Sequence, residues 1–165
     1  MNIEDIKTIG VAGTGSMGVG IMQVAAQAGF QVRAVDVSAA AWDRALKTIT
    51  KSLERMLAKE KIIEEELKAT LSRISFSTEL ESLKDVPFIF EAIFENLEVK
   101  KEFYQKLDAV SREDVIYASN TSSLSITEMA SLVKHSSQFI GTGFTLIFII
   151  RMNAHRSKQV LMLLC

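Results

Sequence analysis

The sequence is poor in the residues that cross-link small secreted domains and bind metals. Its 165 residues include one cysteine, one proline and two histidines. The cysteine is Cys165, which excludes a disulfide framework and a cysteine-based metal site within the chain, and we expect no metal site. The formal net charge is −1, so we expect no general attraction to nucleic acid or to a membrane surface. The low cysteine content favours a reducing, cytoplasmic compartment.

Long hydrophobic runs are also missing. The longest apolar stretch, residues 144–150, is far too short to span a bilayer. The first five residues carry no basic segment and lead into no long apolar run, so we expect no secretory signal peptide. The hydrophobic fraction of 48% is ordinary for a globular protein, and the chain is long enough for one domain with a proper core.

The most informative stretch is residues 11–18, which read Val-Ala-Gly-Thr-Gly-Ser-Met-Gly and have the spacing G-x-G-x-x-G. Residues 6–12 are short, apolar and rich in β-branched side chains, which predicts a buried strand. Apolar residues then recur at helical spacing from Met17 to Ala28, and Gly29 is a typical helix C-cap. The glycines therefore lie on a strand-to-helix turn, the context in which this motif predicts dinucleotide binding.

Each glycine of the motif has a predicted physical role. Gly13 allows a tight turn, Gly15 lets a pyrophosphate approach the backbone, and Gly18 lets the helix pack closely on the strand. The helix N-terminus adds free N–H groups and a partial positive charge, both of which favour phosphates. The motif therefore predicts where the pyrophosphate of a dinucleotide would lie.

A second predicted strand, residues 31–35, ends at Asp36. An acid about twenty residues after the glycines is placed to hold the ribose hydroxyls of NAD and would repel the 2′-phosphate of NADP. Arg33 could accept a 2′-phosphate, but it lies within the strand rather than after it. The predicted cofactor is therefore NAD.

The rest of the chain alternates between predicted helices and strands. Ser38 is a suitable N-cap for a helix, whose buried stripe we expect to be Trp42, Leu46, Ile49, Leu53 and Leu57. A second helical run, residues 62–71, forms a helical hairpin with it. Asn96 caps a later helix, whose expected apolar stripe is Val99, Phe103, Leu107 and Val110. Ser125 or Thr127 opens a short helix that runs to Leu132.

This alternation predicts an α/β fold of the Rossmann type, a doubly wound parallel sheet with right-handed crossovers. Besides the two strands above, the expected strands are residues 74–77, 87–93, 115–118 and 138–141. The expected strand order is 3-2-1-4-5-6, with the helical hairpin inserted after strand 2. A ligand would bind in the crevice beyond the carboxyl ends of these strands.

Two further polar segments leave the same edge of the predicted sheet as the glycine turn. They are residues 91–96 and the small polar run at residues 119–123. Alone, Glu95 would be interpreted as a solvated loop acid and the serines as a strand-end turn with a helix cap. Their convergence with the glycine turn favours a binding site.

Four basic residues recur with a spacing of four in the first helix of the hairpin: Lys47, Lys51, Arg55 and Lys59. Two interpretations remain open. The residues form a solvated helix face, or they receive a polyanionic substrate such as the phosphates of a coenzyme.

The segments GTGSMGVGI, FEAIFENLEVKKEF, ASNTSSLSIT and FIG together resemble the NAD-binding domain of the 3-hydroxyacyl-CoA dehydrogenases. The likeness covers about residues 5–141, and NTSSL and ENLEVK together are specific to that family. The resemblance implies NAD-dependent oxidation of a 3-hydroxyacyl-CoA to a 3-oxoacyl-CoA. The residues that it implies for the adenosine half of NAD are Gly13, Thr14, Gly15, Ser16, Met17, Gly18 and Asp36.

The same resemblance implies contacts nearer the reaction. Glu95 and Lys100 match family residues near the nicotinamide, and Ser122 matches a residue that contacts both nicotinamide and substrate. Ser52 and Lys59 match positions that contact the CoA moiety. For Lys59, this match favours the functional interpretation of the basic residues.

The likeness ends where the family carries its general base, in a segment of the form G-x-H-F-F-N-P-V followed by M-K-L-x-E. Here Gly143 stands in place of the histidine, Leu146 in place of the asparagine and His155 in place of the orienting glutamate. A general base must titrate near neutral pH within hydrogen-bond reach of the hydroxyl. Neither of the two histidines, His135 and His155, lies in that motif, so the expected general base is not found.

Residues 144–165 contain basic residues but no acid, and they resemble nothing in the family. We therefore expect an NAD-binding domain at residues 1–143 and an atypical tail at residues 144–165, in place of the helical C-terminal domain through which family members dimerise. The tail is either an out-of-frame or alternatively spliced end, or a divergent C-terminus that extends the sixth strand. Two functional hypotheses follow: a dehydrogenase of this family, or an NAD-binding module without catalytic activity.

Overall fold

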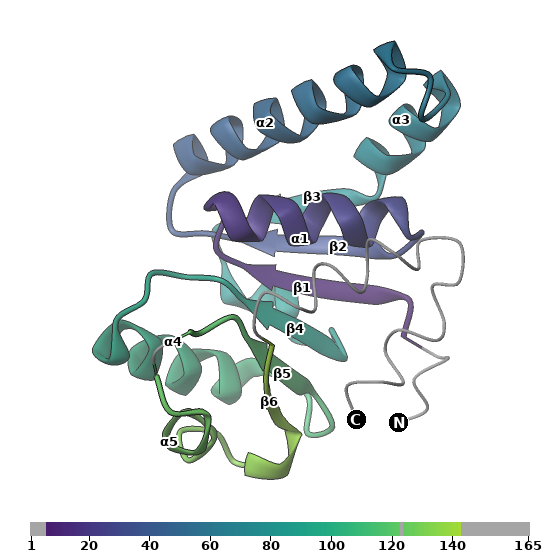
Figure 1. Cartoon of the computed structure of the whole chain (residues 1–165). Coiled ribbons are helices and arrows are strands. Elements are labelled where there is room, and N and C mark those ends of the chain that lie inside the picture. Colours follow the sequence, from purple (N-terminus) through teal and green to yellow (C-terminus); the bar gives the residue numbers. More distant parts are fainter. Residues whose placement is uncertain (1–5, 123, 143–165) are drawn as a thin grey trace.

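The structure is a computed structural model that describes residues 6–122 and 124–142. Within these residues, six parallel strands form one sheet in the order β3-β2-β1-β4-β5-β6 (Figure 1). The strands are β1 (Thr8–Ala12), β2 (Gln31–Val35), β3 (Ile74–Ser77), β4 (Phe88–Glu91), β5 (Ile116–Ser119) and β6 (Phe139–Gly141). The predicted fold class and strand order are confirmed. The predicted tail, residues 144–165, lies outside the described residues.

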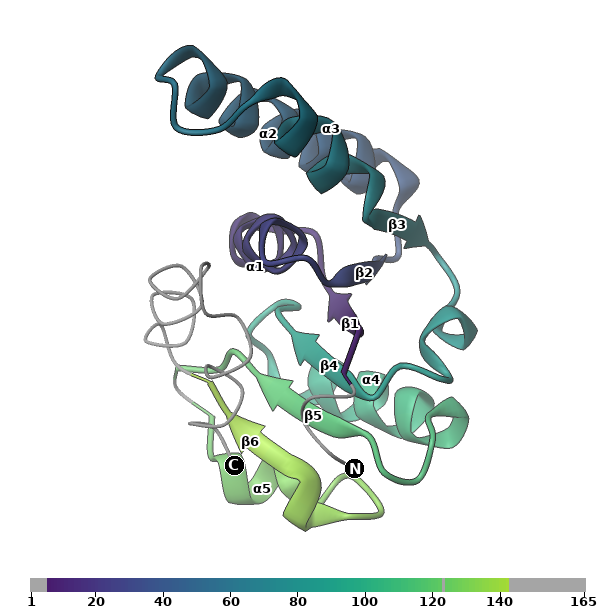
Figure 2. The ribbon, with the colours of Figure 1, turned by 90° about the vertical axis from the view of Figure 1, so that its right-hand side faces the viewer.

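Helices cover both faces of the sheet, as in a doubly wound fold. On one face lies α1 (Ser16–Gln27), against which α2 (Ala39–Ala58) and α3 (Glu64–Ser72) pack. On the other face lie α4 (Leu97–Val110) and α5 (Ile126–Ala130) (Figure 2). The two helices α2 and α3 are the predicted helical hairpin after the second strand.

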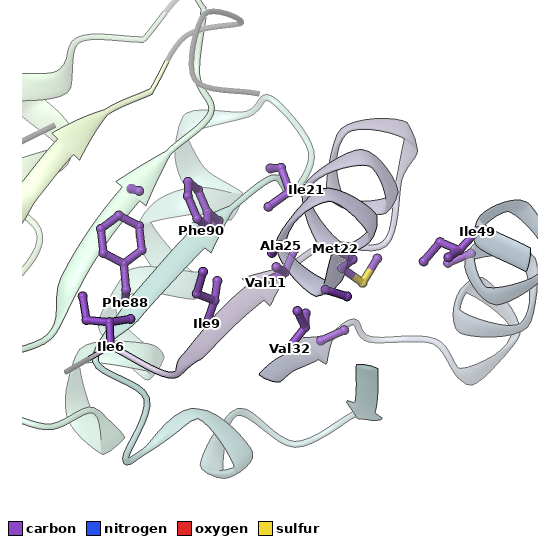
Figure 3. Close-up of a cluster of buried hydrophobic side chains, with 14 of the residues drawn as sticks. Ile6, Ile9, Val11, Ile21, Met22, Ala25, Val32, Ile49, Phe88 and Phe90 are labelled. Carbon is purple, nitrogen blue, oxygen red and sulfur yellow. The ribbon is translucent and has the colours of Figure 1, made fainter. Parts of the chain in front are cut away.

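The core on the α1 side forms around the two central strands (Figure 3). Ile9 and Val11 of β1 and Phe88 and Phe90 of β4 point to the face of the sheet that α1 covers, in one cluster that also contains Met22 of α1. Each of these side chains is at most 1% exposed. Burial of such a side chain contributes about 1.5–3 kcal/mol to stability. This packing holds β1 and β4 side by side, and so determines where the segments that follow them emerge.

Close backbone packing explains two glycines of the turn after β1. Gly13 has a φ of +95°, and a Cβ there would lie 2.4 Å from the carbonyl oxygen of Ala92. A Cβ on Gly18 would lie 1.9 Å from the carbonyl oxygen of Gly13, so the first turn of α1 lies directly on the turn that precedes it. A tight turn at Gly13 and a close helix approach at Gly18 were both predicted from the motif, and both are confirmed.

Local hydrogen bonds account for the element ends. Ser38 and Asn96 cap α2 and α4 as predicted, accepting the N–H groups of Ala41 (3.3 Å) and Val99 (3.1 Å). Of the two candidate caps for α5, Ser125 is the one in place. That helix ends at Ala130 rather than Leu132. The hydroxyl of the next residue, Ser131, donates to the carbonyl oxygen of Glu128 (2.6 Å), an alternative to continued helix.

Strand β4 is shorter than the predicted segment, residues 87–93. It ends at Glu91 because the carboxylate of that residue accepts the N–H of Ile93 (2.9 Å) and turns the chain. This hydrogen bond replaces the ladder bond that a longer strand would have made. The chain therefore leaves the sheet directly at an acidic side chain.

The predicted apolar stripe of α4 is wrong at its first position. Val99 is 44% exposed, whereas the face turned toward the sheet carries Lys100, Tyr104 and Leu107, all fully buried. The periodicity alone favoured Val99, because a lysine rarely occupies a core position. Lys100 can do so because two carboxylates face it, as described below.

Candidate functional site

The carboxyl ends of the strands bring together the segments that the sequence analysis singled out. In the sheet register Ala12 lies beside Glu91, which lies beside Ser119, which lies beside Gly141. Ala12 also lies beside Val35 on its other side. The glycine turn, Asp36 and the segments after β4 and β5 therefore leave the same edge of the sheet.

The N-terminus of α1 is open at this edge. Its N-cap is Gly15, and no side chain hydrogen-bonds to the cap position. Gly15 and Ser16 are exposed, and a Cβ on Gly15 would meet nothing within 4 Å. Uncapped N–H groups at the positive end of a twelve-residue helix form an anion site. This geometry fits the pyrophosphate of a dinucleotide, the role predicted for Gly13–Gly18.

Asp36 is tied to the glycine turn. One of its carboxylate oxygens accepts both the N–H (2.8 Å) and the hydroxyl (2.7 Å) of Thr14. Arg33, the alternative contact for a 2′-phosphate, instead forms an ion pair with Asp85 and donates to the carbonyl oxygen of Ser82 (3.0 Å). Among the residues that the structure describes, the end of β2 carries an acid and no free arginine, which fits the ribose of NAD rather than NADP.

Beneath the segments after β4 and β5 lies a buried charge cluster, which we call the 91–100 cluster (Glu91, Glu95 and Lys100). The ammonium of Lys100 lies 3.0 Å from Glu91 Oε2 and 2.7 Å from Glu95 Oε2. The Lys100 and Glu91 side chains are each only 1% exposed, whereas Glu95 is 34% exposed. The cluster connects a fully buried strand end with a loop carboxylate at the surface.

Glu95 in turn holds the segment after β5. Its Oε1 accepts the N–H of Ser122 (3.1 Å) and the hydroxyl of Thr121. Burial raises the pKa of the Glu95 carboxyl, but hydrogen bonds from Lys100, Thr121 and Ser122 outweigh burial and lower that pKa to about 2. Glu95 therefore stays ionised at neutral pH and fixes the backbone that carries Ser122.

The structure does not bring Ser52 and Lys59 to this edge. Ser52 lies within α2, which begins close to Asp36, and Lys59 is the C-cap that follows its last residue. A helix of that length, 20 residues, spans about 30 Å, so Lys59 lies at its far end. The four basic residues with a spacing of four, Lys47, Lys51, Arg55 and Lys59, are all exposed, and none pairs with an acid among the described residues. Their CoA contacts and the solvated-face alternative both remain predictions.

His135 is exposed and lies before the 3₁₀ turn Ser136–Gln138, which leads into β6. It therefore lies on the amino side of that strand, away from the carboxyl edge. His155 and Gly143 are outside the described residues. Within residues 6–122 and 124–142, no group of three or more His, Cys, Asp or Glu could hold a metal ion. In the same part of the chain, no helix is long and apolar enough to cross a membrane.

Sequence reasoning missed the roles of Glu91, Tyr104 and Ser119, which support the site from below. The Ser119 hydroxyl donates to Glu91 Oε2 (2.6 Å), and the Tyr104 hydroxyl lies 3.4 Å from the same oxygen. Burial raises the pKa of Tyr104 well above its usual range, which keeps the phenol protonated as a donor. One feature of the sequence could have indicated these roles: Glu91 ends the otherwise apolar strand at residues 88–91. A carboxylate that is buried at such a position needs hydrogen-bond or charged partners.

The sheet order, the open glycine turn and the acid after β2 define a Rossmann-type dinucleotide-binding domain. A family model described as the NAD-binding domain of 3-hydroxyacyl-CoA dehydrogenase matches residues 8–146. The chain belongs to this 3-hydroxyacyl-CoA dehydrogenase family, and NAD is the cofactor of the matched domain.

Individual relatives agree with this assignment. A probable 3-hydroxybutyryl-CoA dehydrogenase of Bacillus subtilis (strain 168) is 44% identical over 140 residues, which is 85% of this chain and 49% of that protein. A mitochondrial hydroxyacyl-coenzyme A dehydrogenase of Rattus norvegicus is 41% identical over 145 residues, covering 84% and 46%. The crystal structure of (S)-3-hydroxybutyryl-CoA dehydrogenase from Ralstonia eutropha has a TM-score of 0.83 at 40% identity, covering 85% and 50%. The chain thus spans about half the length of the relatives that it matches.

Proposed function

We propose that this chain supplies the NAD-binding half of an enzyme that oxidises the 3-hydroxyl group of a 3-hydroxyacyl-CoA to a ketone. In this proposal residues 1–143 are the cofactor domain, residues 144–165 are an atypical tail, and the setting is cytoplasmic. The substrate is a 3-hydroxyacyl-CoA, or a 3-oxoacyl-CoA in the reverse direction. The named activities of the relatives support this substrate class.

One observation carries the proposal: Ser122 is held by Glu95 at the same sheet edge as the open N-terminus of α1. The N–H groups at Gly15 and Ser16 would bind the pyrophosphate, and Asp36 would accept hydrogen bonds from the ribose hydroxyls. The Ser122 hydroxyl would then orient the substrate beside the nicotinamide. When bound, NAD supplies the hydride acceptor for the oxidation.

The second hypothesis, an NAD-binding module without catalytic activity, rests on the missing base. Oxidation of an alcohol needs a group that removes the hydroxyl proton, and such a group typically contributes about 10²–10⁴ in rate. Gly143 stands at the position of the family histidine, and His135 lies on the amino side of β6. Under this hypothesis the chain binds the cofactor but does not catalyse the oxidation.

A single titration of the full chain separates the two hypotheses. NADH is added to the purified chain while nicotinamide fluorescence is recorded, and acetoacetyl-CoA is added afterwards. A fluorescence change on mixing, followed by a steady loss of NADH, supports the dehydrogenase. A stable fluorescence change supports the inactive module. If NADH produces no fluorescence change at millimolar concentration, both hypotheses are wrong.

A further inference from the structure

Glu91 and Lys100 are almost completely removed from solvent, at 1% and 0% exposure, although both are charged side chains. Desolvation of two charges is expensive, and replacing a buried ion pair by apolar residues of similar volume is often neutral or stabilising. Stability alone is therefore a weak reason for this pair. Its contacts lead toward the cofactor site, and they suggest a different role.

Glu91 is rigidly held from three elements. Its Oε1 accepts the N–H of Ile93 (2.9 Å) in the segment after β4. Its Oε2 accepts the hydroxyl of Ser119 in β5 (2.6 Å) and lies 3.4 Å from the hydroxyl of Tyr104 in α4. The same Oε2 lies 3.0 Å from the ammonium of Lys100. A carboxylate with this many donors cannot rotate, so it gives Lys100 a fixed anchor.

From Lys100 the contacts run outward to the surface. The ammonium lies 2.7 Å from Glu95 Oε2, and Glu95 Oε1 accepts the N–H of Ser122 (3.1 Å). The Thr121 hydroxyl donates to the same Oε1 and accepts the N–H of Leu124 (3.1 Å), which continues the same segment. Each step from Glu91 to Ser122 is therefore a direct contact. Ser122, the exposed residue at the end of this series, is the one proposed to contact substrate and nicotinamide.

We propose that Glu91 is a positioning residue that acts through Lys100 and Glu95 to hold the backbone of Ser122 in place. The inference rests on the proposed function for the role of Ser122 itself. Two carboxylates share one ammonium, so the position of Lys100 is set by both. Without the Glu91 charge, Lys100 keeps only Glu95, which is one-third exposed and able to move with it. The Ser122 N–H then loses a fixed acceptor.

The test substitutes Glu91→Gln in the full chain and measures hydrogen exchange at the Ser122 amide by NMR, without cofactor. Glutamine keeps the shape and can accept from Ile93 or Ser119, but its NH₂ group cannot pair with an ammonium. The matched control is Tyr117→Phe. It removes the β5 hydroxyl that donates to the Asp108 carboxylate of α4 (3.3 Å) but keeps the ring that packs edge-on against Tyr104, and this hydroxyl makes no hydrogen bond to the 91–100 cluster. Ser119→Ala, which removes one donor from Glu91, is the milder second variant.

We expect Glu91→Gln to speed exchange at Ser122 by about tenfold, the effect of losing one charge-assisted hydrogen bond of average strength. Ser119→Ala should accelerate exchange at Ser122 by less, and Tyr117→Phe should leave exchange at Ser122 unchanged. The inference would be overturned if exchange at Ser122 were unchanged in both Glu91→Gln and Ser119→Ala. It would also be overturned if Tyr117→Phe accelerated this exchange as much as Glu91→Gln does. Should Glu91→Gln not fold, Ser119→Ala decides the outcome.

A parallel NADH titration keeps the two proposals apart. Exchange at Ser122 is measured on the free chain, so its outcome does not depend on cofactor binding. If the wild-type chain binds NADH, we expect Glu91→Gln to weaken that binding and Tyr117→Phe not to do so. Equal NADH affinity in Glu91→Gln and in the wild type would overturn the link between Glu91 and the site. Absence of NADH binding in the wild type would refute the proposed function alone.

Discussion

Asp36 and Thr14, which lie 22 residues apart in the sequence, are joined by two hydrogen bonds to one carboxylate oxygen. The bonds connect the end of β2 with the glycine turn after β1. Within the described residues the second carboxylate oxygen of Asp36 makes no hydrogen bond. One oxygen therefore fixes the turn, and the other remains for the ribose that the proposed function assigns to it.

The Asp36→Asn variant is expected to weaken NADH binding about tenfold, because a neutral amide is a weaker acceptor than a carboxylate for the ribose hydroxyls. It should also narrow the preference for NADH over NADPH, since the repulsion of a 2′-phosphate is removed. Fluorescence titrations with both cofactors measure these effects. Asp43→Asn, an exposed acid of α2, makes the same change in net charge and should leave both affinities unchanged. An unaltered NADH affinity in Asp36→Asn would contradict the assignment.

Substitution by alanine should destabilise the fold at Gly13 and leave it almost unchanged at Gly15. Gly13→Ala places a Cβ 2.4 Å from the Ala92 carbonyl oxygen at a φ of +95°, so we expect a loss of about 2–4 kcal/mol in the free energy of unfolding. Gly15 has a φ of −69° and open space around it, so Gly15→Ala should fold within about 0.5 kcal/mol of the wild type. Thermal unfolding measures both variants.

The same pair tests the site. Because a Cβ on Gly15 would occupy the space that a pyrophosphate needs, Gly15→Ala should bind NADH at least tenfold more weakly despite its intact fold. Gly15→Ala with wild-type stability and wild-type NADH affinity would show that phosphates do not approach this turn. Gly13→Ala is the contrasting variant, because we expect it to lose stability, whereas Gly15→Ala loses only NADH affinity.

The low pKa of Glu95 predicts an acid-sensitive contribution to stability. Its folded pKa of about 2 lies below the pKa of 4.5 that the carboxyl has in the unfolded chain, so ionised Glu95 stabilises the fold fully above about pH 4.5. That contribution is lost as the pH falls from 4.5 toward 2, where Glu95 takes up a proton and releases Lys100 and Ser122. Denaturant unfolding of wild type and Glu95→Gln between pH 2 and pH 7 measures the difference.

We expect the stability difference between wild type and Glu95→Gln to be constant at neutral pH and to shrink steadily below pH 4.5. The control is Glu113→Gln, which removes an exposed acid before β5 and should change the free energy of unfolding by no more than about 0.5 kcal/mol at neutral pH. A Glu95→Gln difference that stays constant down to pH 2 would contradict the lowered pKa. A difference that shrinks only above pH 5 would contradict its direction.

The basic residues of α2 offer a test of the two interpretations left open. The Lys59 ammonium is exposed, so Lys59→Gln should change the free energy of unfolding by no more than about 0.5 kcal/mol. If the residue meets coenzyme A, the variant should bind coenzyme A several-fold more weakly at low salt, and added salt should reduce the difference. Calorimetric titration with coenzyme A measures both effects. Lys106→Gln, which removes an exposed charge from α4, is the control, and equal affinities of both variants would favour the solvated face.

Much of the architecture could be predicted because it depends on short-range patterns. The short apolar runs of β1 and β4, the helical spacing in α1 and α2, and the caps at Ser38 and Asn96 each need only a few neighbouring residues. The strand order then followed from the Rossmann-type fold that the glycine motif and the alternating elements predict. These local preferences agree with one another along the chain, which is why the predicted elements and the observed ones coincide within a few residues.

The environments of the charged groups could not be predicted in the same way, because their partners come from distant segments of the chain. The spacing in α4 favoured Val99 as a core residue, yet the tertiary structure buries Lys100 against Glu91 of the neighbouring strand. Arg33 looked available until the fold placed Asp85 beside it, 52 residues further along the chain. The glycine motif and the periodicity of the segments around it were enough to predict a dinucleotide-binding sheet and its glycine turn. Only the tertiary structure decided which charges are neutralised and how Ser122 is held, because an ion pair forms only between groups that the fold brings within a few ångströms.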